Sequence, residues 1–314
     1  MKEELLKAFG ALAPKVYDSK ISLENDKAAI AISSLLSEPQ GLILVEYLSN
    51  ELEHGKKPIY LASEFLSNEA LSRLIEKFYR VREQESLQIL LAYYNQIWVQ
   101  GLDNPSGSYE TLRKLAKSAA TNSATVILKL CLDCALVLDN SLTECNGCSG
   151  KNLLEISQLT LAEQARAALR QGQFLEIYVK ECLVQSGVEL IGYQSSNRSP
   201  KGYIGVEYRV HGEPVEIDVH GIVQPLTILL SEVKTAQKIT INDLRRVDSV
   251  FQGLAERVNK SSQLDIPCLK LFIITGEFDQ NIPRKAYTRK SWELIDRTMI
   301  PGLAEELKRI QQEL

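Results

Sequence analysis

Two pairs of closely spaced cysteines constrain this chain more than any other feature of its sequence. Cys131 and Cys134 enclose two residues, Cys145 and Cys148 enclose two more, and ten residues separate the pairs. Two pairs with this spacing let four thiolates converge on one tetrahedral ion with little backbone strain. An Asn-Gly dipeptide inside the second pair favours the tight turn that such a site needs. We therefore expect these four cysteines to bind a structural Zn²⁺.

Two other interpretations of the cysteines stay open. The first pair lies in the apolar stretch 129–138 and would also suit core positions at the end of a buried helix. A disulfide framework is the second alternative, which a cytoplasmic location disfavours. A catalytic zinc site is not expected, because no histidine or carboxylate near the pairs completes an open coordination sphere.

Composition and the first residues indicate an ordinary globular protein of the cytoplasm. The chain is 45% hydrophobic and 24% charged, which excludes a wholly disordered chain, a collagen and a coiled-coil rod. Charged residues precede any apolar stretch at the start, so a secretory signal is not expected. No run of about 18 apolar residues is present, so we expect no membrane partner.

The net charge of −4 argues against a polybasic nucleic-acid binder. The acidic excess lies within residues 1–150, whereas residues 151–314 are neutral. A nucleic-acid partner remains compatible with this balance, because binding depends on where the charges lie rather than on their sum.

A length of 314 residues predicts about two or three domains. Apolar residues at helical spacing predict a helical N-terminal domain over 1–105, with helices near 24–37, 40–54, 67–83 and 86–100.

Residues 106–150 predict a winged-helix-like segment that carries the zinc site. The pattern indicates a helix at 109–120, a second helix that ends near Cys131, and a short strand at 135–138. Helix, turn, helix and strand is the order of a winged helix-turn-helix, with the zinc pairs beside the wing.

Residues 151–314 predict an α/β domain. The expected order is a helix, three strands, a helix and a strand, over 161–186, 205–210, 215–223, 226–234, 241–258 and 269–275. A right-handed crossover through the second helix would bring the last strand parallel into the same sheet.

Charged side chains interrupt two of these predicted strands. Period-two alternation places Asp218 on the polar face of its strand and places Glu232 and Lys234 together on one face of the next strand. Two carboxylates on neighbouring strands can share one Mg²⁺. Lys234 can then polarise an attacking water or stabilise charge that develops on a phosphate. The alternative is a solvated ladder of charges on a surface strand.

Asp218, the run Glu232-Val233-Lys234 fourteen positions later and the upstream helical Glu176 resemble the PD-(D/E)xK, or restriction-endonuclease-like, nuclease superfamily. The resemblance covers roughly residues 160–280 and implies an αβββαβ core, with a mixed sheet flanked by helices. One departure is that Ile217, rather than a proline, directly precedes Asp218.

The resemblance also implies the roles of these residues. Asp218, Glu232 and the carbonyl group of Val233 would bind Mg²⁺ or Mn²⁺, with Lys234 on the side of the nucleophile. Glu176 would bind or orient a second metal ion. In-line attack by water would leave a 5′-phosphate and a 3′-hydroxyl group.

We therefore expect a metal-dependent endonuclease that hydrolyses phosphodiester bonds in nucleic acid, with DNA favoured over RNA by analogy alone. The N-terminal zinc and helical region would position the substrate or a partner. A homodimer is expected, since cutting both strands with one site per chain needs two copies.

Two non-enzymatic alternatives are also considered. One is a zinc-containing winged-helix DNA-binding protein whose nuclease-like domain serves only binding or dimerisation. The other is an interaction scaffold in which the zinc site and the helices dock a separate ATPase or specificity subunit. The sequence contains no Walker-type phosphate loop, so any NTP-driven step would need another chain.

Overall fold

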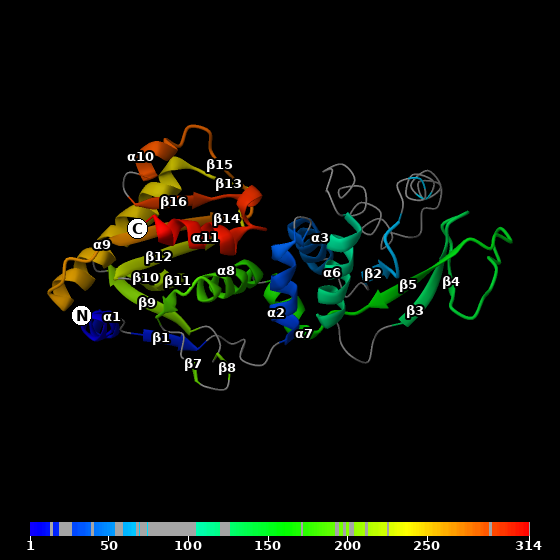
Figure 1. Ribbon diagram of the computed structural model, residues 1–314, viewed down its shortest axis with the longest axis horizontal. Coiled ribbons are helices and arrows are strands. Elements are labelled where there is room, and N and C mark those ends of the chain that lie inside the picture. Colours follow the sequence, from blue (N-terminus) through cyan, green and yellow to red (C-terminus); the bar gives the residue numbers. More distant parts are fainter. Residues whose placement is uncertain are drawn as a thin grey trace. The chain divides into compact units, whose positions relative to one another are not determined.

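In the computed structural model the chain forms two compact units, and each is described by itself. Unit 1 comprises Met1–Asp26 and Gly172–Leu314, and unit 2 comprises Lys27–Gln171. Both ends of the chain therefore belong to unit 1 (Figure 1). The structure describes residues 1–12, 15–18, 27–38, 41–53, 59–66, 69, 74, 105–119, 126–170, 172–191, 195–196, 199–200, 204–210, 213–224, 226–288 and 291–313.

This division differs from three consecutive domains with boundaries near 105 and 150. The first 26 residues belong with the C-terminal part of the chain, and the later boundary falls at 171/172. The helix expected over 161–186 is accordingly two helices, α7 (Glu163–Arg170) in unit 2 and α8 (Gln173–Gln185) in unit 1. Gly172 separates them with a left-handed backbone (φ 67°), which glycine adopts without steric cost.

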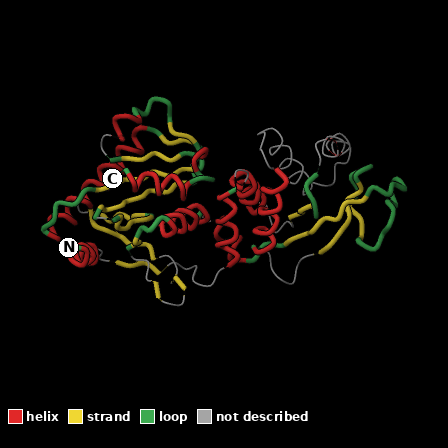
Figure 2. The backbone as a smooth tube through the Cα atoms, viewed as in Figure 1, coloured by secondary structure: helices red, strands yellow, loops and turns green. Residues whose placement is uncertain are grey.

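A five-stranded mixed sheet forms the centre of unit 1, in the order β16-β14-β12-β11-β6 (Figures 1 and 2). Its strands are β6 (Glu189–Leu190), β11 (Val219–Val223), β12 (Thr227–Lys234), β14 (Cys268–Ile274) and β16 (Trp292–Ile295). Strand β12 is antiparallel to β11 and parallel to β14. The parallel pairing confirms the prediction that a crossover helix returns the chain to the same sheet. That helix is α9 (Ile241–Ser262), which begins at a capping box formed by Thr240 and Asp243.

A second sheet of unit 1 contains β1 (Lys15–Asp18), β9 (Ile204–Val210) and β10 (Glu213–Ile217). The single strand expected over 215–223 is therefore wrong, because the chain ends β10 at Ile217 and begins β11 at Val219 in the other sheet. Asp218 occupies the break between the two strands. Two-residue strands form the pairs β7 (Ser195–Ser196) with β8 (Ser199–Pro200) and β13 (Lys238–Ile239) with β15 (Glu277–Phe278).

Helices α1 (Lys2–Leu12) and α9 share one hydrophobic core with the central sheet. The rings of Phe251 on α9 and Trp292 on β16 stack in this core, with centroids 5.5 Å apart. Helix α8 packs against β12 and against α11 (Leu303–Gln312), and the Tyr178 hydroxyl group donates a 3.0 Å hydrogen bond to the Ile300 carbonyl group. Two short helices, α10 (Arg284–Thr288) and η3 (Arg297–Met299), complete the described helices of this unit.

Unit 2 combines helices with an antiparallel sheet in the order β2-β5-β3-β4. Its strands are β2 (Ile59–Ala62), β3 (Val126–Cys131), β4 (Val137–Asp139) and β5 (Leu153–Leu159). Besides α7, its described helices are α2 (Lys27–Ser34), η2 (Leu35–Ser37), α3 (Gly41–Glu53) and α6 (Pro105–Ser118). Helix α2 packs against α6 and α7.

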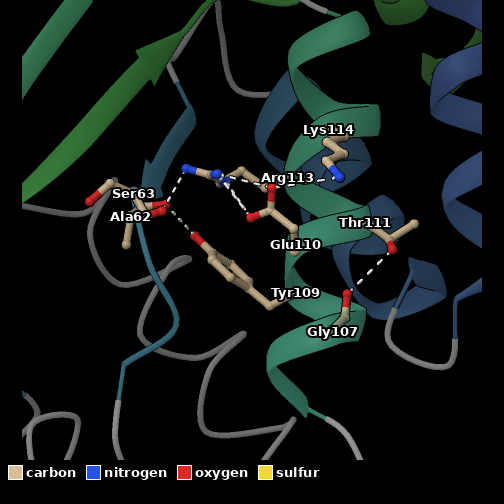
Figure 3. A network of polar contacts seen from close by, with 8 residues as sticks. All are labelled: Ala62, Ser63, Gly107, Tyr109, Glu110, Thr111, Arg113 and Lys114. Carbon is tan, nitrogen blue, oxygen red and sulfur yellow. Dashed lines mark hydrogen bonds and ion pairs between the residues drawn. The ribbon is translucent and has the colours of Figure 1, made fainter.

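Polar contacts attach α6 to the end of β2 (Figure 3). The Tyr109 hydroxyl group donates a 2.8 Å hydrogen bond to the Ala62 carbonyl group. The Arg113 guanidinium group donates to the Ser63 carbonyl group and pairs with Glu110, one turn earlier on the same helix. These bonds satisfy backbone carbonyl groups just where the strand ends.

The winged helix-turn-helix expected over 106–150 is not formed. The first of its helices corresponds to α6, but the second is replaced by strand β3, whose backbone pairs with β4 on one side and β5 on the other. Tertiary pairing thus overrides the local helical pattern, and the β-branched pair Val126-Ile127 suits a strand.

Of the N-terminal helices, those expected near 24–37 and 40–54 are observed as α2 with η2 and as α3. The helices predicted at 67–83 and 86–100 fall outside the described residues, except for Glu69 and Leu74. No described helix is both long and apolar enough to cross a membrane.

Candidate functional site

Asp218 and Glu232 come together where β11 and β12 pair. The antiparallel register ends at the pair Val219 and Ser231, and Asp218 and Glu232 are the next residues beyond it, with charges that interact. The backbone N–H of Val233 donates a 2.8 Å hydrogen bond to Oδ2 of Asp218. This bond fixes one carboxylate oxygen, and Oδ1 can take another partner.

Lys234 lies on the same face of β12 as Glu232, as the sequence predicts. Its Nζ is 2.7 Å from Oε1 of Glu232, whose side chain is 11% exposed, whereas the Lys234 side chain is 42% exposed. The carboxylate is therefore held inside the fold while the ammonium group also reaches solvent. A wholly solvated ladder of charges does not describe this pair, because Glu232 is buried.

Glu176 reaches the same region from helix α8. Gly172 at the start of the helix lies close to the chain just after β12, where a Cβ atom on this glycine would be 3.0 Å from Oγ1 of Thr235. This close approach sets the first turn of α8 beside the end of β12. Glu176 lies in that turn, and its charge interacts with those of Asp218 and Lys234.

Lys180 also belongs to this cluster, although the sequence analysis did not select it. Its side chain is 8% exposed and its Nζ lies 3.6 Å from Oε2 of Glu176, one helical turn earlier. The available signal was a glutamate and a lysine four residues apart on a helix, which is usually a surface pair. Only the tertiary structure shows that Lys180 is buried.

Burial sets the protonation of these groups. It raises the pKa of Glu176 to about 7, with a further increase from Asp218 and a decrease from Lys180. Burial also raises the pKa of Asp218, although the hydrogen bond from the Val233 N–H acts to lower it. In the same way burial raises the pKa of Glu232, although Lys234 acts to lower it. Burial lowers the pKa of Lys180 to about 8, although Glu176 favours its charged form.

Lys234 differs from Lys180 in the balance of these effects. Burial opposes its charge, but the hydrogen bond to Glu232 and the nearby carboxylates outweigh burial and raise its pKa. Lys234 is therefore charged at neutral pH. Arg246 on α9 adds a second positive charge that acts on Glu232 and lowers its pKa.

His220 takes no part in the cluster as a base. Its Nε2 lies 2.7 Å from the hydroxyl oxygen of Tyr208, and its ring packs against Phe9. Burial lowers the pKa of His220 to about 3, so the ring is neutral and belongs to the core.

The donor set suits a hard cation at Asp218 and Glu232. Carboxylate oxygens are typical Mg²⁺ ligands, and this ion keeps several waters and needs only one or two carboxylates. Glu176, Asp218 and Glu232 do not bring three carboxylate oxygens together at one point. Within the described part of the chain, only the four cysteines bring three or more candidate ligand atoms within 4.8 Å of one another.

The four cysteines are brought together at the end of the β3–β4 hairpin of unit 2. Sγ of Cys131 is 3.6 Å from Sγ of Cys148, and Sγ of Cys134 is 3.4 Å from Sγ of Cys145. Four sulfurs around one zinc lie about 3.8 Å apart, from a Zn–S distance of about 2.3 Å. All four cysteines are free, and these two distances are well beyond a disulfide bond of about 2.05 Å, so the structure contains no disulfide bond among them. This group can hold a metal ion such as zinc.

Each cysteine pair is built on the same turn. The N–H of Cys131 donates to the carbonyl group five residues later, and the carbonyl group of Cys131 accepts from the N–H four residues later. Cys145 makes the same two bonds with Gly150 and Ser149. The fourth residue after each first cysteine, Ala135 or Ser149, has a positive φ of 62° or 58°. Cys131 therefore lies at the end of strand β3 and Cys134 in the turn that follows it, and neither lies at the end of a buried helix.

Backbone N–H groups favour thiolates at this site. Those of Gly147 and Cys148 outweigh burial and lower the pKa of Cys145 to about 7. Those of Asp133 and Cys134 act in the same direction on Cys131, but burial prevails there and raises its pKa. The site can therefore lose its first proton near neutral pH, and a bound cation would favour loss of the others.

No protein-family model matches this chain. No curated protein matches it significantly either.

Proposed function

We propose that unit 1 is a metal-dependent nuclease of the restriction-endonuclease-like type that hydrolyses phosphodiester bonds, with DNA as the favoured substrate. One observation carries the proposal, namely that Asp218 and Glu232 lie directly beyond the last paired residues of β11 and β12, with the Lys234 ammonium group 2.7 Å from the second carboxylate. The order helix, strands, crossover helix and parallel strand around this pair is consistent with such a core.

In this proposal Asp218 and Glu232 hold Mg²⁺ or Mn²⁺, and the bound ion supplies Lewis acidity and lowers the pKa of water. Lys234 stabilises negative charge that develops on the phosphate or orients the attacking water. Water oxygen bonds to phosphorus as the bond from phosphorus to the 3′ oxygen breaks. The leaving oxygen takes a proton, so the products are a 5′-phosphate and a 3′-hydroxyl group.

Val233 has a second role besides the one that the sequence resemblance implies. Its N–H orients Asp218, in addition to any contact that its carbonyl group makes with the ion. The four cysteines would bind structural Zn²⁺ in unit 2, within the reducing cytoplasm that the sequence predicts. Unit 2 would position nucleic acid or a protein partner. That partner would be a second copy of the chain, or a separate ATPase or specificity subunit.

The test is cleavage of labelled single- and double-stranded DNA and RNA by the purified full chain, with Mg²⁺, Mn²⁺ or excess EDTA. We expect cleavage with a divalent ion that Asp218→Asn and Lys234→Met each reduce at least about 100-fold, as loss of a metal ligand or its support does. Asp265→Asn and Lys260→Met are matched controls, since both residues are exposed and lie near the C-terminal end of α9. Equal cleavage by the controls and the site variants would overturn the site, and no cleavage of any substrate would overturn the activity.

A further inference from the structure

Lys180 is the one buried cation of the carboxylate cluster that the proposed reaction does not use. Lysine side chains normally extend to keep the ammonium group in water. Lys180 instead lies on the inner side of α8 with 8% of its side chain exposed and its ammonium group beside Glu176. With so little exposure it cannot reach a substrate phosphate, so any effect it has passes through the carboxylates.

The charges of the cluster indicate what Lys180 does. When ionised, Glu176, Asp218, Glu232 and Glu216 carry four negative charges, and Lys180, Lys234 and Arg246 carry three positive charges that act on them. The ammonium group of Lys180 lies on the Glu176 side of the cluster, 3.6 Å from that carboxylate, and its charge also acts on Asp218. One divalent ion would more than neutralise what remains, and a second ion at Glu176 would meet a fixed positive charge.

We propose that the ammonium group of Lys180 takes the place of a second metal ion at Glu176, so that the carboxylate cluster binds a single divalent cation through Asp218 and Glu232. Lys180 is then a positioning residue that neutralises Glu176 and fixes the metal stoichiometry. This inference rests on the proposed metal-dependent function, and it replaces the expectation that Glu176 binds or orients a second ion.

The experiment counts bound Mn²⁺ in the full chain, with the cysteine site first filled with zinc and no nucleic acid present. Electron paramagnetic resonance of free Mn²⁺ gives the stoichiometry, and calorimetry gives the affinity. We expect one Mn²⁺ per wild-type chain and two per Lys180→Met chain, because methionine keeps the length of the side chain and removes its charge. Glu176→Gln combined with Lys180→Met should return the count to one, and Lys260→Met should leave it at one.

Two Mn²⁺ ions in the wild type, or one in a folded Lys180→Met chain, would overturn the inference. If Lys180→Met does not fold, Lys180→Gln serves as the second neutral variant, and a count of one Mn²⁺ in that folded chain would likewise overturn the inference. No bound Mn²⁺ in the wild type would remove the proposed function as well. Two bound ions together with cleavage would leave that function standing and remove only the role of Lys180.

Discussion

The backbone N–H of Val233 donates a 2.8 Å hydrogen bond to the carboxylate of Asp218. Val233 belongs to β12 and Asp218 precedes β11, so the bond lies where regular pairing of these two strands ends. It orients a buried carboxylate that would otherwise be costly to keep ionised. The strand break at Asp218 and the pairing of β12 therefore act together in building the candidate site.

Asp218→Asn should test this orientation as well as the charge. The amide oxygen of asparagine can still accept from Val233, so we expect the fold to persist with a change in the free energy of unfolding of about 1 kcal/mol or less. Binding of Mn²⁺ should nevertheless weaken at least 10-fold, because the anionic ligand is lost. Calorimetric titration with Mn²⁺ and urea unfolding of the same samples check both parts. Unchanged Mn²⁺ affinity would contradict the assignment of Asp218.

Gly172→Ala should destabilise unit 1 by more than Gly187→Ala. Both glycines flank α8 with positive φ, so alanine costs about 1–2 kcal/mol at either. Only at Gly172 would the new Cβ meet a neighbour, Oγ1 of Thr235 at 3.0 Å, whereas nothing lies within 4 Å at Gly187. Urea unfolding of both variants measures the difference. Thr235→Ala in the Gly172→Ala background should recover the contact part of the loss, and failure to recover any of it would contradict this account.

Replacing Cys145 and Cys148 together by serine should abolish zinc binding and destabilise unit 2 alone. A structural zinc contributes directly to folding, and unit 1 has its own hydrophobic core. Metal analysis should find one zinc per wild-type chain and none in the double variant. Cys182→Ala is the matched control, since this buried cysteine lies on α8 of unit 1 and should leave the zinc content unchanged. Full zinc occupancy in the double variant would contradict the site.

Glycine at Ala135 or Ser149 should stabilise the cysteine turns. Both residues hold left-handed φ values of 62° and 58°, which cost a non-glycine residue about 1 kcal/mol. We expect Ala135→Gly and Ser149→Gly each to raise the free energy of unfolding of the zinc-loaded protein by up to that amount. Gln263→Gly, at a third left-handed position at the end of α9, provides a comparison outside the metal site. A loss of stability in both turn variants would refute the expectation.

Without bound metal, the free energy of unfolding of unit 1 should fall as pH rises from about 4.5 to about 7, because of the carboxylate cluster. Burial raises the pKa of folded Glu176 above its unfolded value of 4.5 to about 7, so the folded state binds the proton more tightly in this window. The stabilisation is complete below pH 4.5 and is lost as pH rises through 7. Glu176→Gln should remove part of this slope in urea unfolding at pH 4.5–7.5. An identical slope in the variant would show that Glu176 does not titrate in this range.

Much of the candidate site can be predicted from local sequence. The spacing of Cys131, Cys134, Cys145 and Cys148 predicts a shared site because two residues between cysteines suit one tight turn, and the structure brings all four together. The alternation in β12 places Glu232 and Lys234 on one face because strand side chains repeat every two residues. The continuous apolar run of β14 predicts a central strand that is buried on both faces.

Other features depended on contacts distant in sequence. The strand β3 forms because β5, more than twenty residues later, pairs with it, and the local helical pattern carries no information about that partner. Helix α1 belongs to unit 1 because it packs against α9, and the spacing of apolar residues within α1 does not predict that partner.

The sequence by itself determined which residue types are available for metal and phosphate chemistry, and at which spacings along each element. Only the tertiary structure decided which of them are buried together. Lys180 shows the difference, since a glutamate–lysine pair on a helix is ordinarily solvated, and the packing of α8 against β12 buries Lys180 and leaves Glu176 only partly exposed. Desolvation is a property of neighbours from distant parts of the chain, and it is what shifts the pKa values of the cluster.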